Sequence, residues 1–374
     1  MSDLADADEF ASAIARRADE IDAGFALLFF SRELMDAEGL ATALTRHAPD
    51  LDYAGCSTAG EITPTGLQEG QVMAILFPRR NFTAVSAMVR NLAVAGMEDI
   101  AGEVEKLRRN LYAQTGSTDS SNVFALCLID GLSFAEEAVI SAIHWGLDDI
   151  PLVGGSAGDD LKFETTELLS NGCADNDCAV VILISTSVPF HVFKTENFLP
   201  TDKKLVVTAA EPDKRLVHEF NASVAAEEFA SAIGIANDAL TPLSFASHPI
   251  VVRVGGEYYC RSIRKMHADG SLSFFCAIDD GIVLSIAEPT GMVETTRTAL
   301  KNVDEKLGGI DVVLGFDCVL RRLDARNRQV FRDISELYSA NNVIGFGTYG
   351  EQYRSMHLSQ TLVGIAFGQT QAIE

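Results

Sequence analysis

A short glycine-rich motif occurs three times in this chain and constrains its fold more than any other feature. The first copy is GCSTAGE at 55–61, and a near copy is GFGTYGE at 345–351. A third copy, one residue shorter, is GGSAGD at 154–159. Each copy follows a short apolar run and ends in a carboxylate. Glycine permits backbone conformations and close approaches that other residues forbid, and hydroxyl groups can bond nearby amides. Three such turns indicate three copies of one structural unit.

The segments around the turns repeat in the same order. Apolar runs precede the turns at 25–30, 123–129 and 312–316, ending 25, 25 and 29 residues before the first turn glycine. Each interval has a helical pattern, and further apolar runs follow the turns at 72–77, 179–184 and 361–367. Continuous apolar runs of this length are typical of strands buried on both faces of α/β sheets. We therefore predict an α/β fold built on repeated strand–helix–strand–glycine turn–strand units.

Composition limits the classes of function. The 374 residues are 47% hydrophobic, which is enough for a large core and favours two domains. A formal net charge of −24 argues against unassisted binding to nucleic acid and against docking on an anionic membrane. The acidic N-terminus lacks a signal-peptide pattern, and the apolar runs are too short to cross a bilayer. These features predict a cytoplasmic protein.

A change of pattern near residue 215 marks the predicted domain boundary. Before it, an amphipathic helix over 4–22 lies within an N-terminal segment, 1–24, and residues 25–214 form a first domain with two repeat units. After it, the second domain, 215–374, contains a helix over 215–233. An antiparallel meander of period-2 strands over 250–286 and the third repeat unit follow.

These motifs resemble those of FIST-domain proteins over about residues 25 to 368. The segments AGCSTAGEI and VGGSAGDDL resemble the N-terminal FIST domain. The second half resembles the C-terminal FIST domain through RSI and DGSL in the meander, then GFDC, GFGTYGEQY and SQTLVGIAF. The resemblance implies a ligand-binding sensory module.

Stand-alone bacterial proteins of this type are similar to the nitric-oxide-sensing haem proteins of the NosP kind. That similarity implies a haem cofactor, a diatomic gas as ligand, and signalling to a histidine kinase or to a diguanylate cyclase or phosphodiesterase. A homo-oligomer is compatible with such a protein.

If haem binds, His191 is the candidate iron ligand. It lies in an apolar strand between Phe190 and Phe193, and strand alternation places it on the same face as Phe193. An imidazole on an apolar wall with aromatic neighbours suits a porphyrin. Candidate partners for the propionates are Lys194, Arg253, Arg261 and Arg264. The alternatives are a half-buried histidine bonded to a carbonyl and basic residues paired with local acids.

The glycine turns are a second candidate site, because loops at the carboxyl ends of strands line ligand crevices in open α/β sheets. The predicted ligand-binding residues are Gly55, Ser57, Thr58, Glu61, Gly155, Ser156, Asp159, Thr348, Tyr349 and Glu351. A haem-free sensor of small molecules such as amino acids would use the three carboxylates to meet an ammonium group. Alternatively, these residues only cap the local backbone. A hydrolase using Cys56 or Ser57 as nucleophile is a further alternative, although no sequence feature designates its base.

Overall fold

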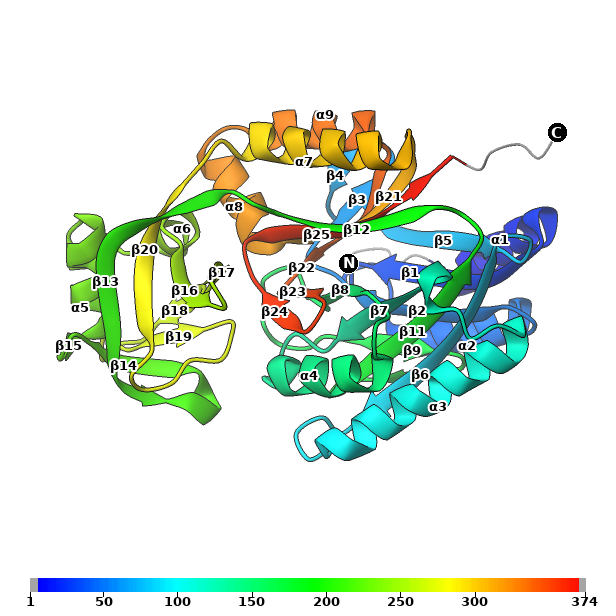
Figure 1. The fold of residues 1–374 in the computed structure, drawn as a ribbon, viewed down its shortest axis with the longest axis horizontal. Helices are drawn as coiled ribbons and strands as arrows, with labels where there is room; N and C mark the ends of the chain where they lie inside the picture. The colour runs from blue at the N-terminus through cyan, green and yellow to red at the C-terminus, as the bar shows by residue number, and fades with distance from the viewer. Residues whose placement is uncertain (1–5, 370–374) are drawn as a thin grey trace.

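The computed structural model describes residues 6–369, which form a larger and a smaller lobe (Figure 1). The larger lobe contains the three repeat units, and the smaller lobe is formed by residues 198–289, at the left of the figure. The fold is α/β, as predicted.

Each repeat unit has the predicted order of elements, with a β-hairpin added between the glycine turn and the last strand. The first unit consists of β1 (Ala23–Phe30), α2 (Ala37–His47), β2 (Asp52–Ser57), β3 (Glu61–Thr63), β4 (Gly66–Gln68) and β5 (Val72–Pro78). The second consists of β7 (Val123–Ile129), α4 (Glu136–Leu147), β8 (Leu152–Ser156), β9 (Leu168–Ser170), β10 (Cys173–Asp175) and β11 (Cys178–Thr186). The third consists of β21 (Ile310–Cys318), α8 (Val319–Asn327), α9 (Phe331–Ala340), β22 (Val343–Thr348), β23 (Glu351–Tyr353), β24 (Met356–Leu358) and β25 (Thr361–Gly368).

The added hairpins are exchanged between units in a cycle. The hairpin β3–β4 of the first unit pairs with β22 of the third. The hairpin β9–β10 of the second unit pairs with β2 of the first, and β23–β24 of the third pairs with β8 of the second. Each sheet is therefore completed by a neighbouring unit, so the three units depend on one another.

The three sheets share a central core and carry their helices on the outside. In β1, Phe25, Leu27 and Phe29 face the central core, while the alternate residues face the helices. This burial of both faces explains the continuous apolar runs in the sequence. The outer layers are α1 (Ala7–Ile21) with α2, α3 (Met97–Thr115) with α4, and α7 (Met292–Leu307) with α9 (Figure 1). The helix predicted over 4–22 is α1, and residues 4 and 5 lie outside the described residues.

Two connecting strands extend the second and third sheets. The strand β6 (Phe82–Arg90) follows the first unit and pairs antiparallel with β11 of the second. The strand β12 (Phe190–Glu196) follows the second unit and pairs antiparallel with β25 of the third. Within residues 6–369, no strand pairs with the corresponding edge of β5 in the first unit.

The smaller lobe is one antiparallel sheet in the order β17-β16-β20-β13-β14-β19-β18. Its strands are β13 (Phe198–Glu211), β14 (Leu216–Phe220), β16 (Ile250–Val254), β17 (Glu257–Cys260), β18 (Ile263–Met266), β19 (Leu272–Phe274) and β20 (Val283–Pro289). The short β15 (Ser223–Val224) and the helices α5 (Ala225–Ile233) and α6 (Pro242–Ser247) complete it, with 3-10 turns at Pro212–Lys214 and Asn237–Ala239. A further 3-10 turn lies at Ser120–Asn122 in the larger lobe.

Two sequence predictions for this lobe need correction. The meander is not continuous, because β13 and β14 lie between β20 and β19. The helix predicted from residue 215 begins at Ala225, since Arg215, Asn221 and Ala222 have positive φ and interrupt it. The predicted boundary at 215 falls inside the lobe, and the predicted second domain contributes its third unit to the larger lobe.

No helix within the described residues is long and apolar enough to cross a membrane.

Candidate functional site

The three glycine turns pack against one another at the centre of the larger lobe. The Ala59 amide donates to the Gly347 carbonyl at 2.9 Å, and the Gly158 amide donates to the Ser57 carbonyl at 3.1 Å. The Ser156 amide donates to the Gly350 carbonyl at 2.7 Å. A Cβ atom on Gly158 would lie 2.8 Å from the Cβ of Ala59, closer than packed carbons approach. Glycine is therefore required here by contact between turns.

The carboxylates of the first and third turns are satisfied by internal hydrogen bonds. The Thr58 hydroxyl donates to Glu61 at 2.5 Å, and the amide of Gln71 donates to the other carboxylate oxygen at 3.0 Å. Glu351 accepts in the same way from the Thr348 hydroxyl and from Thr361. Burial raises the pKa of Glu61 to about 7 and that of Glu351 to about 8. Both side chains are fully buried, so they are not accessible to a ligand's ammonium group.

The serines of the turns are also buried and bonded. Ser57 accepts a hydrogen bond from the Glu167 amide at 3.0 Å, and Ser156 accepts one from the Gln352 side chain at 2.9 Å. Gly55 and Gly155 lie against backbone and side chains of neighbouring strands. Both serines thus bond to a segment of the next unit, Ser57 to the second unit and Ser156 to the third, so they join the units and do not merely cap their own backbone. Cys56 is fully buried, and burial raises its pKa well above the usual value, so it is not an exposed thiolate nucleophile.

The structure does not bring the predicted haem residues together. His191 and Phe193 share the face of β12 that packs against α7, and Nε2 of His191 lies 3.3 Å from Nζ of Lys306. Burial and the Lys306 charge lower the pKa of His191. Phe190 lies on the opposite face and packs against Phe124, with ring centroids 5.2 Å apart. The helix covers the face on which a porphyrin would have to lie, so these residues do not fit a haem pocket.

The predicted propionate partners lie elsewhere. Lys194 forms ion pairs with Glu196 at 2.7 Å and with Glu257 at 3.4 Å. Arg261 donates to the carbonyl of Cys260 at 3.3 Å. Arg264, in contrast, lies in a cleft between the two lobes.

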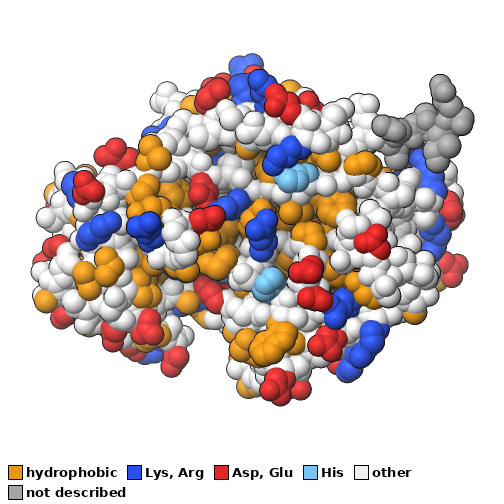
Figure 2. All heavy atoms as spheres, viewed as in Figure 1, with side chains coloured by type: hydrophobic (Ala, Val, Ile, Leu, Met, Phe, Trp, Pro, Cys, Tyr) orange, Lys and Arg blue, Asp and Glu red, His pale blue; other side chains and the backbone are white. Residues whose placement is uncertain are grey.

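This cleft has a volume of about 680 Å³ and is lined by both lobes. The larger lobe contributes Phe134, Lys162 and Phe163; the smaller lobe contributes Lys214, Leu216, Pro242, Arg264, Lys265, His267 and Ser273. Figure 2 shows hydrophobic side chains exposed along the boundary between the lobes, with basic side chains among them. The lining is therefore aromatic and basic in a chain whose net charge is −24.

Arg264 lies between the two phenylalanines of the cleft. Its guanidinium carbon is 4.7 Å from the ring centroid of Phe163 and 5.6 Å from that of Phe134. Among residues 6–369 no carboxylate forms an ion pair with it, and burial lowers its pKa. The lysines at the rim differ, since Lys162 pairs with Glu33 at 2.8 Å and Lys214 with Glu211 at 2.5 Å. Arg264 is thus a partly buried cation that lines the cleft and has no ion-pair partner among residues 6–369.

Both phenylalanines have left-handed backbone conformations. The φ angle is +58° at Phe134 and +55° at Phe163, and Asp160 and Leu161 in the same loop are also positive, at +55° and +66°. Such conformations cost about 1–3 kcal/mol each and concentrate at ligand-binding sites. Positive φ also occurs in turns far from the cleft, but bulky phenylalanines rarely adopt it, so the surrounding structure holds both rings in place.

Two predicted ligand residues, Asp159 and Tyr349, form hydrogen bonds to the backbone of the loop that contains Phe163. Asp159 accepts hydrogen bonds from the amides of Phe163 at 2.9 Å and of Glu164 at 2.7 Å. The Tyr349 hydroxyl accepts from the Leu161 amide at 2.8 Å and donates to Asp159. The Tyr349 ring stacks on Phe163, with centroids 4.9 Å apart. Asp159 and Tyr349 are therefore positioning residues for the wall of the cleft.

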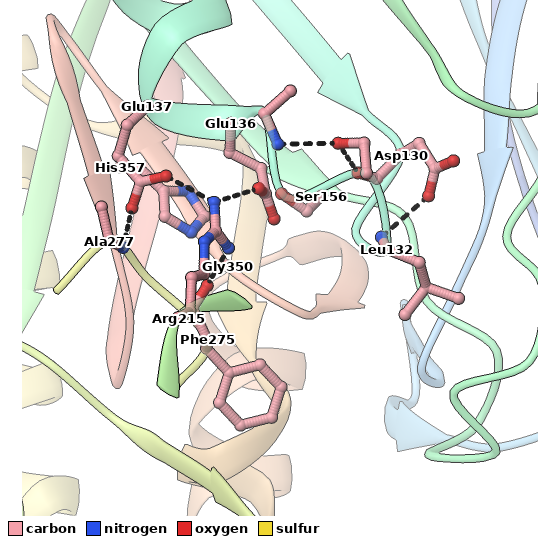
Figure 3. Close-up of polar contacts among 12 residues, drawn as sticks. Asp130, Leu132, Glu136, Glu137, Ser156, Arg215, Phe275, Ala277, Gly350 and His357 are labelled. Carbon is pink, nitrogen blue, oxygen red and sulfur yellow. Dashed lines mark hydrogen bonds and ion pairs between the residues drawn. The ribbon is translucent and has the colours of Figure 1, made fainter. Parts of the chain in front are cut away.

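Beside the cleft, a buried ion-pair cluster joins the lobes (Figure 3). Arg215, directly before β14, lies 2.6 Å from Glu136 and 2.5 Å from Glu137 at the beginning of α4. It also donates to the Phe275 carbonyl at 2.6 Å, and Glu137 accepts from the Ala277 amide at 2.5 Å. We call Arg215, Glu136 and Glu137 the interlobe latch. Its arginine also lies 5.3 Å from the ring centroid of Phe134, so the latch and the cleft share a wall.

Sequence reasoning found Arg264, Asp159 and Tyr349 but missed Phe134 and Phe163. Nothing in the sequence marks a phenylalanine with a left-handed backbone. A weak signal was available for Arg264, because an arginine on a strand without a nearby acid is unusual in so acidic a chain.

Comparison with known proteins gives matches along most of the chain. The model of the FIST N domain matches residues 24–223, and that of the FIST C domain matches residues 225–354. The chain is also similar to an uncharacterized protein of Methanocaldococcus jannaschii, with 23% identity over 209 residues. The matched region covers 54% of this chain and 40% of that relative, so the chain spans less than half of the relative's length. The chain therefore belongs to the FIST family, with a FIST N domain followed by a FIST C domain.

Proposed function

We propose that this protein is a sensor that binds a small carboxylate-bearing molecule in the cleft between its lobes, without haem. FIST domains are sensory, ligand-binding domains of signal transduction and not catalytic ones, so family membership supports the general role. The observation that carries the finer proposal is Arg264, a partly buried guanidinium without a carboxylate partner among the described residues, held between two aromatic rings.

The chemistry of the cleft favours a carboxylate over a cation. A guanidinium presents paired donors that match the two oxygens of a carboxylate, and charge-assisted hydrogen bonds of this kind are strong. Lys265 and His267 add basic groups to the same lining, and the faces of Phe134 and Phe163 suit the apolar part of a small ligand. An amino acid is a ligand of this class. The carboxylates that were predicted to meet its ammonium group are engaged inside the turns or beneath the cleft.

Binding would connect the two lobes, which is what a sensor requires. The ligand would touch Arg264 of the smaller lobe and the phenylalanines of the larger lobe, next to the latch. A ligand that prefers one relative position of the lobes shifts the population toward it. The predicted partners, a histidine kinase or a diguanylate cyclase or phosphodiesterase, would sense that shift.

A calorimetric titration of the full chain tests this proposal. The probes are amino acids, small mono- and dicarboxylates, and the matched uncharged amides. We expect at least one carboxylate to bind and its amide to bind much more weakly. Arg264→Gln should weaken the carboxylate by about 10- to 100-fold, the effect of losing one or two charge-assisted hydrogen bonds.

The matched control is Arg253→Gln. Arg253 is an exposed arginine of the same lobe that lies over Tyr258 and does not line the cleft. Its loss should leave affinity unchanged. Equal effects of the two substitutions, or equal binding of acid and amide, would contradict the proposal.

Haem-based sensing of nitric oxide remains a separate prediction, and the packing around His191 does not support it. The test is an absorption spectrum of the chain expressed with haem supplied, compared with the His191→Ala variant. A Soret band that shifts with nitric oxide and is lost in the variant would establish His191 as the ligand despite the covering helix. Absence of stoichiometric haem uptake is the outcome that the packing predicts.

A further inference from the structure

We propose that the outer edge of β5 is a docking site for an extended segment of a partner protein. The segment would pair antiparallel with β5 and place alternate apolar side chains in the groove between the first and third units. This proposal is independent of the ligand proposed for the cleft.

The internal repeats show what is missing at this edge. In the second sheet, β6 pairs with β11 along the whole of that strand, and in the third sheet β12 pairs with β25 from Thr361 to Phe367. All but one residue of β11 and every residue of β25 are buried. In β5, at the equivalent place, Phe77 alone is buried. Within the described residues, the first sheet therefore lacks an outer strand equivalent to β6 in the second sheet and β12 in the third.

A groove lies where the inner side chains of that strand would lie. Its volume is about 230 Å³. Ile75 and Phe77 of β5 line one side, and Val312, Ile344 and Phe367 of the third unit line the other. The lining is mostly apolar on both walls, and Arg80, Asn81 and Asp311 are its polar residues.

The occupied positions show the same packing. Phe190 of β12, in the third sheet, packs on Phe124 of the second unit at 5.2 Å between ring centroids. Phe82 of β6, in the second sheet, packs on Phe77 of the first unit, also at 5.2 Å. The outer strand of the third sheet thus packs on the second unit, and that of the second sheet packs on the first unit. If the same order continues, a strand added to the first sheet would pack on the third unit, and the groove lies at that place.

The edge itself lacks the features by which edge strands avoid pairing. Its sequence is VMAILFP, without a charged residue, and proline stands only at its end. Extended peptides that add to such an edge gain main-chain hydrogen bonds, and side-chain pockets supply specificity.

The groove favours a flexible segment over a second copy of this chain. A strand inserted there must bury one face against the third unit. In β5 of a second copy, that face is already packed on its own core through Met73, Ile75 and Phe77. The occupant we infer is a strand-forming segment with apolar residues at alternate positions, like Phe190 and Val192 of β12, which face the central core.

The test uses a fluorescent peptide with the sequence of residues 188–196, VPFHVFKTE, and the full chain. We expect saturable binding by anisotropy and slower hydrogen exchange at the amides of residues 72–78. A peptide N-methylated at alternate residues on its pairing edge should bind about tenfold more weakly or worse, because it cannot donate to β5.

Protein variants locate the groove. Ile344→Lys places a charge on the groove wall and should weaken peptide binding about tenfold or more. The matched control, Val283→Lys, changes a valine that is 52% exposed on β20 and should leave binding within about twofold. The methylated peptide keeps the test valid if Ile344→Lys does not fold.

Several results would overturn the proposal. These are absence of peptide binding, binding that N-methylation does not weaken, or exchange at 72–78 that the peptide does not change. A concentration-dependent dimer that Ile344→Lys dissociates, without peptide binding, would assign the edge to a second copy. If deletion of residues 370–374 were needed before the peptide could bind, the occupant would be the chain's own C-terminus.

Discussion

The glycine-turn core and the interlobe cleft both contain polar residues, but the hydrogen-bond and ion-pair partners of these residues differ. In the core, Thr58 and Thr348 bond to Glu61 and Glu351, and the turn backbones bond to one another. In the cleft, Arg264 has aromatic neighbours and no carboxylate partner among the described residues. A buried polar group with internal partners stabilises a fold, whereas a partly buried cation without an ion-pair partner remains available to solvent or to a ligand. Hydrogen bonding within the protein thus distinguishes the glycine turns from the cleft, although residues of both regions were candidate ligand residues in the sequence.

Breaking the interlobe latch should give the largest effect on stability. Arg215→Met leaves Glu136 and Glu137 without their cation, and removing one partner of a buried ion pair costs about 3–5 kcal/mol. Urea unfolding measures the loss. Lys214→Met is the neighbouring control, whose exposed pair with Glu211 should be worth about 1 kcal/mol or less. Similar losses for both variants would show that the latch is not a special contact.

Adding a methyl group at the turn contact should have the next largest effect. A Cβ on Gly347 would lie 2.6 Å from the Ala59 carbonyl oxygen, so Gly347→Ala should cost about 1–3 kcal/mol by overpacking. In Gly102→Ala, within α3, the new Cβ meets no atom within 4 Å and should stabilise by about 0.5–1 kcal/mol. Thermal unfolding of the pair compares them. A neutral Gly347→Ala would mean that the turns do not need their close contact.

The buried turn carboxylates should make stability depend on pH. Burial raises the pKa of Glu351 from 4.5 in the unfolded chain to about 8, so the folded state retains a proton that the unfolded state has lost. Stability from this group is present below pH 4.5 and falls as pH rises toward 8, by at most about 1.4 kcal/mol per pH unit. Glu351→Gln should flatten this part of the profile, measured by urea unfolding between pH 5 and 8. An unchanged slope would contradict the assignment.

Removing the cation of the cleft should have the smallest effect on the unliganded protein. Arg264→Gln leaves no carboxylate unpaired but removes two cation–π contacts, each worth about 0.5–1 kcal/mol, while relieving the cost of a partly desolvated charge. The free energy of unfolding should therefore fall by about 1 kcal/mol or less. Together with lost ligand binding, that result would place Arg264 in function and not in stability. A loss as large as that of Arg215→Met would instead make it a structural residue.

The sequence predicted the repeat units well because their signal is local. Strands such as 25–30 and 123–129 bury both faces, which produces unbroken apolar runs, and the glycine turns follow them at nearly constant distance. The exchange of hairpins was not predictable, since three-residue strands such as β3 and β23 carry little pattern and their partners come from other units. The helix predicted from residue 215 was wrong because positive φ at Asn221 and Ala222 is a tertiary outcome.

For the candidate site, the sequence supplied residues but not their grouping. Arg264 was selected from the sequence as a partner for haem propionates together with His191, but Arg264 lies on β18 of the smaller lobe and His191 on β12 of the larger lobe. Asp159 and Tyr349 were chosen as ligand residues and serve beneath the cleft wall.

The sequence alone thus determined the family, the α/β class and the repeat units of this protein. The glycine turns and the buried strands are each formed by contiguous residues, so their patterns are visible in the sequence. Only the tertiary structure decided which polar groups are satisfied. Thr58 finds its carboxylate three residues away, but Arg264 meets Phe134 and Phe163 across more than a hundred residues of sequence and meets no acid among the described residues. Whether a charged side chain finds a partner depends on all the elements packed around it, and these elements come together only when the two lobes pack against each other.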